Sequence, residues 1–501
     1  MGTRENKYMQ NHTCRILLWA IASRITLLSL SVMWRSLLSP YDTSASLNPS
    51  CLAMNSSMSA SIPNGSSAKQ VLLPGIASFI EESIVWDSVY FIRIAECGYE
   101  YEQSYAFLPL LPISISLIAN KVLHPLVPII GHRALLALSG YLISNVAFVL
   151  AAVYYYRLSV LVLKDPEAAM QASALFCFNP ASIFYSSIYS ESLYALFSIG
   201  GVYFLMSGAN LLSVLWLALS GSARSNGVLN AGYLCFQSMH QLYDAIFVRK
   251  RPRMVLHILI AGALRCFCIF IPFLAFQAFG YYNLCGGDDP AMVRTWCKAR
   301  IPLLYSFIQS HYWGVGFLRY FQVKQLPNFL LATPILSLAV ASIYSYVKSE
   351  PHKFLALGFG TDYNEEGSAR ILFSQDESKV PTFAASKREN QNLRKRSKKI
   401  SALDADANTS PVDNAPVKSR YHSVIMLPFL LHMGFMATTA FLVMHVQVAT
   451  RFLSASPPLY WFASNLMSSL KTRRWAYLIW VYSVAYILLG SLLFSNFYPF
   501  T

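Results

Sequence analysis

The stretch ALLALSGYLISNVAFVLAAVYYY, Ala134–Tyr156, decides the class of fold because it contains no charged side chain. One helical crossing of a bilayer needs about 20 consecutive apolar residues, and this stretch is longer than that. A chain in lipid must satisfy its own backbone hydrogen bonds, so a segment of this kind crosses as a helix. The stretch therefore predicts an all-α membrane protein.

Similar apolar segments recur along the whole chain. Of its 501 residues, 55% are hydrophobic and 13% are charged, whereas soluble domains carry about 25% charged residues. The further candidate spans are Ile16–Leu38, Phe107–Ile130, Ala181–Met206, Leu211–Phe236, Met254–Tyr282, Pro327–Val347, Ser423–Val448 and Trp475–Ser495. With the shorter segments described below, we expect a polytopic bundle of about 9–13 transmembrane helices.

Basic residues gather in three clusters that flank apolar segments. The formal net charge is +15, and the clusters are Val248–Met254, Lys387–Lys399 and Lys471–Arg474. An excess of lysine and arginine marks the cytoplasmic loops of membrane proteins. We therefore interpret this charge as a determinant of topology rather than as a surface for nucleic acid.

These clusters, together with a basic N-terminus, predict which segments face which side. Residues 39–106 and 283–326 are expected in the lumen. Residues 349–422 form a polar cytoplasmic insert whose composition predicts disorder. The expected organisation is a transmembrane catalytic module over 1–348, the insert over 349–422 and C-terminal transmembrane helices over 423–501.

Two shorter segments complete this topology. An odd number of crossings must join luminal residue 106 to cytoplasmic residue 248, so we expect Gln171–Met206 to cross twice with a break around Asn179-Pro180. Proline lacks a backbone N–H and restricts the residue before it, so helices tend to end there. Pro457–Leu470 is expected to be a short span.

The predicted luminal loops carry two further signals. Asn55 and Asn64 begin N-glycosylation sequons. Cys285 and Cys297 share the second luminal loop and could form a disulfide in an oxidising compartment. No cysteine spacing in the chain suggests a zinc site.

A carboxylate beside a tryptophan is the strongest candidate for chemistry. Asp87 follows Trp86 in SIVWDSVYFIRIAECGYEYEQSY, Ser83–Tyr105, whose apolar residues recur at the spacing of a helix lying on a membrane surface. Partial desolvation there would raise the pKa of the carboxyl group and make its ionised form a stronger base. The alternative is that Asp87 only faces water or caps a turn.

Other charged residues stand in apolar surroundings. Glu191 begins an apolar helix within FNPASIFYSSIYSES, and Arg224 lies in SARSNG inside a hydrophobic segment. Such residues in membrane helices are costly and are usually functional or paired, so a structural Glu191–Arg224 ion pair is the alternative. The aromatic stretch Tyr305–Asn328 is either part of a site or an interfacial anchor. Its charged members are His311, Arg319 and Lys324.

Nucleotide-binding and metalloenzyme signatures are missing from the sequence. We find no P-loop, Rossmann glycine fingerprint, DxD-like motif, HExxH or GxSxG. A transferase of this composition therefore takes its donor from a lipid, and we expect neither a cofactor nor nucleic acid as a partner. A solitary aspartate without nearby ligand spacing also favours a reaction without metal.

Several long motifs together resemble one enzyme family. They cover Trp86–Pro112, Phe178–Leu196, Ser222–Gly227, Tyr305–Ala332 and His445–Phe462, and the C-terminal SNFYPFT also fits. The sequence is similar in these stretches to the PIG-V family, the second mannosyltransferase of GPI-anchor biosynthesis. The polar insert at residues 349–422 departs from compact members of that family.

The resemblance implies a multi-pass GT-C glycosyltransferase of the endoplasmic reticulum membrane with a luminal active site. Its donor would be dolichyl-phosphate mannose, its acceptor the monomannosylated glucosaminyl-phosphatidylinositol, and the new bond α1,6. A small membrane accessory subunit would be compatible with it. An acidic residue of the first luminal loop is essential in such enzymes, and Asp87 occupies the matching position.

The reaction fits these residues chemically. A β-linked donor and an α-linked product require inversion, so one base must take the proton of the acceptor hydroxyl, and Asp87 is the candidate. A phosphate leaving group needs cations rather than a second acid. The predicted substrate-binding residues are Trp86, Glu191, Arg224, His311, Arg319, Lys324 and Arg451. The alternatives are a lipid or solute transporter or scramblase, another dolichol-dependent mannosyltransferase, and a structural scaffold.

Overall fold

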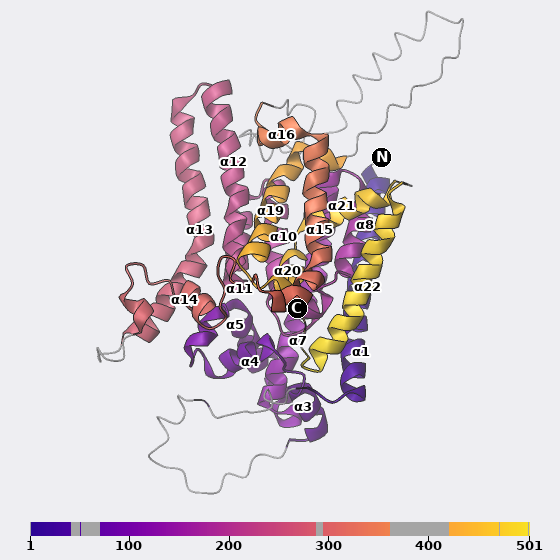
Figure 1. Ribbon diagram of the computed structural model, residues 1–501, viewed down its shortest axis with the longest axis vertical. Helices are drawn as coiled ribbons and strands as arrows, with labels where there is room; N and C mark the ends of the chain where they lie inside the picture. Colours follow the sequence, from indigo (N-terminus) through magenta and orange to yellow (C-terminus); the bar gives the residue numbers. More distant parts are fainter. Residues whose placement is uncertain are drawn as a thin grey trace, which may run out of the picture.

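Six long apolar helices frame the molecule. The computed structural model describes residues 2–41, 51, 71–286, 294–360, 420–469, 471–498 and 500, and every regular element within these ranges is a helix (Figure 1). The all-α membrane fold is therefore confirmed. The helices long and apolar enough to cross a membrane are Gln10–Leu37 of α1, His132–Leu163, Pro252–Cys285, Val323–Ser349, Val424–Leu442 and Arg473–Ser495.

Shorter helices lie between these six and at both ends of the molecule (Figure 1). The long α-helices are α1 (Gly2–Leu37), α7 (His132–Leu163), α13 (Pro252–Cys285), α15 (Leu326–Ser349), α19 (Leu427–Leu442) and α22 (Arg473–Ser495). The shorter ones are α3 (Pro74–Glu81), α4 (Asp87–Cys97), α5 (Leu110–Leu117), α6 (Val127–Ile130), α8 (Pro166–Cys177), α9 (Ser182–Ser186), α10 (Glu191–Met206), α11 (Asn210–Ala223), α12 (Ala231–Tyr243), α14 (Leu304–His311), α16 (Pro351–Leu355), α20 (Ala449–Leu453) and α21 (Pro457–Met467).

The core lies where α7, α8, α10 and α21 meet. α10 packs along α7 on one side and α11 on the other. The rings of Tyr155 and Phe176 stack with centroids 4.7 Å apart, and the indole N–H of the fully buried Trp461 donates to Ser159 Oγ at 2.7 Å. The α12–α13 pair stands at the edge of the bundle (Figure 1), and α13 exposes much of its apolar surface.

Three of the expected spans are interrupted, and for one of them the sequence predicted the interruption. Residues 107–130 form two helical pieces bent by 73°, and residues 211–236 are interrupted after Ala223 by the 3₁₀ segment Ser225–Asn230. The predicted break at Asn179-Pro180 is confirmed, because α8 ends at Cys177 and α9 begins at Ser182. However, α8 has 12 residues and is about 18 Å long, which is too short for the expected double crossing of a core about 30 Å thick.

The count of full-length crossings is correspondingly lower than expected. Six helices, or seven with the bent pair, have the length and composition of a span within the described ranges. An interrupted helix is tolerated at membrane depth when protein groups satisfy its free backbone atoms. Composition alone does not distinguish such a buried, broken helix from a lipid-exposed continuous one.

A buried arginine satisfies the backbone at the break after α8. Arg24 of α1 is 3% exposed. Its guanidinium donates to the carbonyl oxygens of Ser182 at 3.0 Å and Cys177 at 3.3 Å, and to Ser186 Oγ at 3.0 Å. The same group lies 3.8 Å from the centre of the Phe148 ring. Arg24 thus fixes the broken helix against α1, and it forms no ion pair with a carboxylate of the described residues.

Two of the basic clusters lie at the same end of the molecule. The N-terminus of α1, the connection between α12 and α13, α16 and the start of α22 lie at one end, and α3, α4, α5 and α14 lie at the other (Figure 1). The first end carries the basic residues 248–254 and 471–474. The cluster Lys387–Lys399, the sequons at Asn55 and Asn64, and most of the insert 349–422 lie outside the described residues.

We expect Arg24→Met to destabilise the fold. The substitution keeps the apolar stem but leaves the carbonyl groups of Cys177 and Ser182 without this donor, which should cost about 3 kcal/mol. Thermal unfolding of the purified protein in detergent would show a lower midpoint temperature. Arg157→Met is the matched control, because Arg157 is exposed on α7; equal midpoints for the two variants would contradict the role of Arg24.

Candidate active site

A polar cavity of about 410 Å³ opens near the end of the bundle that carries α4 and α14. Its volume lies within the range of small-molecule sites, about 300–1,000 Å³. Seven separate stretches of the chain, between Trp86 and Phe500, form its wall. The polar members are Asp87, Tyr90, Tyr189, Ser190, Glu191, Arg224, Ser225, Asn226, Tyr305, Gln309, His445, Gln447 and Arg451, and the apolar members include Trp86, Phe107, Phe184 and Trp313.

Four charged side chains form a continuous chain of ion pairs along this wall. Arg451 Nη1 lies 3.1 Å from Asp87 Oδ2, and Arg451 Nε lies 3.0 Å from Glu191 Oε1. Arg224 Nη1 contacts the same Glu191 oxygen. The Glu191 side chain is 2% exposed and that of Asp87 is 34% exposed. We call this set the ion-pair chain; two carboxylates and two guanidinium groups balance its charge.

The interruption between α11 and α12 places Arg224 in the wall. Arg224 directly follows α11, which ends at Ala223, and its backbone is extended, with φ −147° and ψ 146°. Behind it the chain folds back so closely that a Cβ atom at Gly227 would lie 2.3 Å from the carbonyl carbon and oxygen of Ser220. Only glycine permits this approach. The motif SARSNG therefore encodes a turn that points functional side chains out of a broken helix.

Asp87 is held at the first position of α4. The preceding Trp86 has φ 56° and ψ −133°, a conformation that is strained for a residue with a side chain. Its indole stacks on Phe497 with centroids 4.7 Å apart. The backbone N–H of Asp87 donates to the Tyr189 hydroxyl at 3.1 Å. These contacts hold Trp86 in its strained conformation and fix the position of Asp87 at the start of α4.

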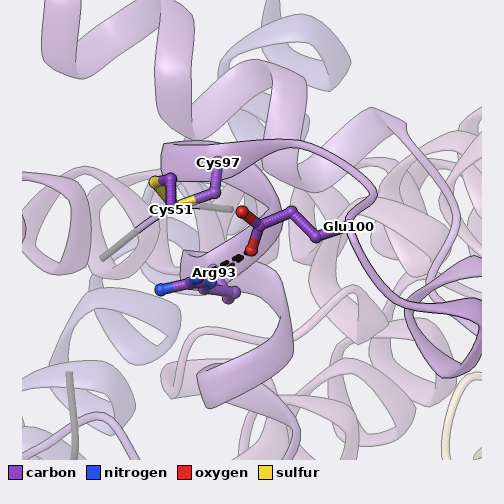
Figure 2. Close-up of a disulfide and its surroundings, with 4 residues drawn as sticks. All are labelled: Cys51, Arg93, Cys97 and Glu100. Atoms are coloured by element: carbon purple, nitrogen blue, oxygen red, sulfur yellow. Dashed lines mark hydrogen bonds and ion pairs between the residues drawn. A yellow bond between two sulfur atoms is a disulfide. The ribbon is translucent and has the colours of Figure 1, made fainter. Parts of the chain in front are cut away.

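The opposite end of α4 is fastened by a disulfide and an ion pair (Figure 2). Cys51 and Cys97 form the disulfide, and Arg93 Nη2 lies 2.7 Å from Glu100. Cys51, Cys97 and Glu100 are close enough together to suggest metal ligands. Both sulfurs are bonded to each other, however, and the carboxylate pairs with Arg93, so this cluster does not fit a metal.

Glu102 joins the two segments that the sequence assigns to the lumen. Its carboxylate accepts from Trp296 Nε1 at 2.7 Å and from the Tyr312 hydroxyl at 2.8 Å, and Arg294 lies 3.0 Å away. The hydrogen bond to Glu102, with burial second, raises the pKa of Tyr312. The expected disulfide Cys285–Cys297 is confirmed. These links hold α14 against the cavity.

Aromatic rings and carboxylates surround Arg451. Its guanidinium carbon lies 5.2 Å from the Phe184 ring centre and 5.4 Å from that of Tyr189. Burial by itself lowers the pKa of this guanidinium, but Glu191 and Asp87 outweigh burial and leave the pKa above its ordinary value. Arg451 is therefore a permanent cation.

The structure brings together five of the predicted site residues and leaves three apart. Trp86, Asp87, Glu191, Arg224 and Arg451 line the cavity. The exposed residues His311, Arg319 and Lys324 do not belong to its lining.

The aromatic stretch that contains these three residues does reach the cavity through other members. Tyr305, Gln309 and Trp313 line it, while the His311 ring stacks on Phe307 with centroids 4.9 Å apart. Sequence reasoning missed Asn226 and Tyr189, although both lie within motifs that it singled out.

Comparisons with known proteins find a family model and relatives that match most of the chain. The family model "Mannosyltransferase (PIG-V)" matches residues 13–501. The chain is 29% identical to GPI alpha-1,6-mannosyltransferase 2 of Cricetulus griseus over 91% of this chain and 84% of that protein. It is 30% identical to the Homo sapiens protein of the same name, over 78% of this chain and 75% of that protein. It is 31% identical to GPI mannosyltransferase 2 of Drosophila pseudoobscura pseudoobscura, over 83% of this chain and 86% of that protein. No solved structure matches the chain.

We expect Glu191→Gln to destabilise the protein strongly, because it leaves two largely buried arginines without their shared carboxylate. Breaking a buried ion pair in this way costs about 3–5 kcal/mol. The thermal midpoint in detergent would report the loss. Glu82→Gln is the control: the Glu82 side chain is 59% exposed in its pair with Arg35, where ion pairs contribute about 0–1 kcal/mol. Similar midpoints for both variants would contradict a central role of Glu191.

Proposed function

Because this chain belongs to the PIG-V mannosyltransferase family, we propose that it transfers an α1,6-linked mannose from dolichyl-phosphate mannose to the monomannosylated glucosaminyl-phosphatidylinositol precursor of GPI anchors. The relatives reported above carry names for this activity. The observation that carries the mechanism is the contact of Asp87 with Arg451 at the cavity wall. Family membership argues against the transporter and scaffold alternatives.

Asp87 is the proposed base. Its contact with Arg451 uses Oδ2, and Oδ1 forms no hydrogen bond or ion pair with the described part of the chain. One third of the side chain is exposed, so an acceptor hydroxyl can approach it. In the reaction Oδ1 takes the hydroxyl proton as the oxygen bonds to C1 of the donor mannose. The bond from C1 to the phosphate oxygen breaks, and its electron pair leaves with dolichyl phosphate.

Arg451 links the base to the leaving group. Before the reaction its charge is shared by Asp87 and Glu191. Protonation neutralises Asp87 while the departing phosphate gains a negative charge. The guanidinium can then favour the phosphate over its former partner, so its attraction to the donor is strongest in the transition state, where it lowers the barrier. A guanidinium has five donors, enough to bind carboxylate and phosphate together.

Arg224 is the second proposed phosphate ligand. It lies at the other end of the ion-pair chain and contacts Glu191. The Glu191 side chain is 2% exposed and contacts both arginines, so we assign it the positioning of Arg224 and Arg451. We assign no role at the phosphate to His311, Arg319 or Lys324.

A luminal position of the cavity is supported by two independent features. The disulfides Cys51–Cys97 and Cys285–Cys297 lie in the segments around the cavity, and disulfides persist in oxidising compartments such as the lumen of the endoplasmic reticulum. The basic clusters at 248–254 and 471–474 lie at the opposite end (Figure 1), as the positive-inside rule requires for that orientation. The proposal leaves room for a small accessory subunit.

Asp87→Asn should abolish GPI anchoring while leaving the amount of protein unchanged, because the amide keeps the shape of the side chain but accepts no proton. Loss of a general base typically lowers the rate by about 10²–10⁴-fold. The measurement is the surface level of GPI-anchored proteins in cells that lack the native enzyme and express the variant. The control is Asp165→Asn, since Asp165 caps α8 away from the cavity. Full rescue by Asp87→Asn would remove Asp87 from the mechanism.

Cells without this protein should accumulate the one-mannose GPI intermediate. The next step requires the second mannose, so its substrate stays unextended. Lipid extraction followed by mass spectrometry would identify the species. A normal GPI-lipid profile would refute the proposed function itself, independently of which residue acts as base.

A further inference from the structure

The side-chain amide of Asn226 is buried in the cavity wall. Asn226 belongs to the 3₁₀ segment Ser225–Asn230, is 8% exposed and lines the cavity. Neither its Oδ1 nor its Nδ2 atom has a hydrogen-bond partner within the described residues. A buried amide in this state destabilises a fold, so its presence requires an explanation outside the packing of the protein.

The polar side chains of Asn230 and Ser225, on either side of Asn226, do have hydrogen-bond partners. Asn230, four residues later, donates from Nδ2 to Ser220 Oγ at 2.9 Å and accepts from Ser198 Oγ at 3.1 Å. The hydroxyl of Ser225 lies 2.7 Å from that of Tyr305. The backbone at Gly227 is pressed against Ser220. The unpartnered amide of Asn226 is therefore specific to this residue rather than a sign of loose packing.

A second unpartnered donor lies beside Asp87. The indole Nε1 of Trp86 is buried without a hydrogen-bond partner in the described part of the chain, and its ring lines the same cavity. Trp86 adjoins the Asp87 end of the ion-pair chain, and Asn226 follows the Arg224 end by two residues. The unpartnered atoms of Asn226 and Trp86 therefore call for polar groups of a ligand at both ends of the ion-pair chain.

The donor and acceptor atoms of the amide limit which class of ligand can bind to Asn226. The Nδ2 atom needs an acceptor, whereas Oδ1 needs a donor. A phosphodiester supplies acceptors only, so phosphate alone leaves Oδ1 unsatisfied. Sugar hydroxyl groups both donate and accept, and two neighbouring ones would satisfy both atoms of the amide. The cavity's aromatic residues are also suited to the apolar faces of a sugar ring.

We propose that Asn226 determines specificity for the donor by hydrogen-bonding hydroxyl groups of the mannose that is attached to the phosphate. The inference rests on the proposed function. Asn226 lies two residues from Arg224, a proposed phosphate ligand, and the transferred sugar is bonded directly to that phosphate. The acceptor sugar then occupies the opposite end, where its hydroxyl must reach Asp87 and where Trp86 offers its indole N–H.

Steady-state transfer by the full-length protein in lipid vesicles tests this role, with dolichyl-phosphate mannose and the one-mannose GPI acceptor varied separately. Asn226→Leu should lower kcat/KM for the donor by about 100-fold or more, because the site loses hydrogen bonds to substrate hydroxyls. The KM for the acceptor should stay within about twofold. The thermal midpoint should be equal to or above that of the wild type, because an unsatisfied buried amide has been removed.

Asn230→Leu is the matched control from the same segment. It removes an amide whose bonds lie inside the protein, so its thermal midpoint should fall. Asn226→Asp, which is isosteric, provides a second variant; its carboxylate repels the donor phosphate and should also lower kcat/KM for the donor.

The possible results distinguish a failure of the role of Asn226 from a failure of the proposed function. If the wild-type protein transfers mannose and Asn226→Leu keeps kcat/KM for the donor within about twofold, or changes only the KM for the acceptor, the role of Asn226 is refuted and the proposed function stands. If the midpoint of Asn226→Leu falls as far as that of Asn230→Leu, the residue is structural. Absence of transfer by the wild type refutes the proposed function instead.

Discussion

A carboxylate shared by two arginines is the constraint on which the active end of this protein depends. Glu191 has a 2% exposed side chain and contacts Arg224 and Arg451. Isolated charges are very costly in an apolar interior, so these three groups must remain together. The start of α10, the end of α11 and α20 are held at one point as a result. Asp87 and α4 then attach to the assembly through Arg451.

Breaks in helices are the means by which a membrane bundle gains a polar cavity. A continuous apolar helix satisfies all of its backbone groups and leaves no polar atom to offer to a substrate. Here the chain is interrupted before α10 and after α11. Contacts within the protein then satisfy the backbone groups that the interruptions leave without helical partners. Arg24 does so at the first break, and Gly227 allows the close packing at the second. The cavity opens where these interruptions meet the disulfide-linked segments.

The charge balance of the ion-pair chain suits transfer from a phosphate donor. The charges of two carboxylates and two guanidinium groups cancel before substrate binds. This balance lowers the free-energy cost of placing four charged groups inside a membrane protein. Moving one proton onto Asp87 shifts the balance toward positive charge at the moment when the leaving phosphate becomes more negative. A solitary base is then sufficient, because the cations take the part that a second acid plays in glycosidases.

The sequence by itself determined the features that depend on neighbouring residues. Apolar length predicted the membrane fold, proline predicted the break at Asn179-Pro180, and proximity along the chain predicted the disulfide Cys285–Cys297. Tertiary structure alone decided which charges meet. Arg451 contacts a residue 364 positions away, and the unsatisfied amide of Asn226 is visible only once every neighbour is placed. Local patterns cannot contain this information, because pairing and burial are set by which distant segments pack together.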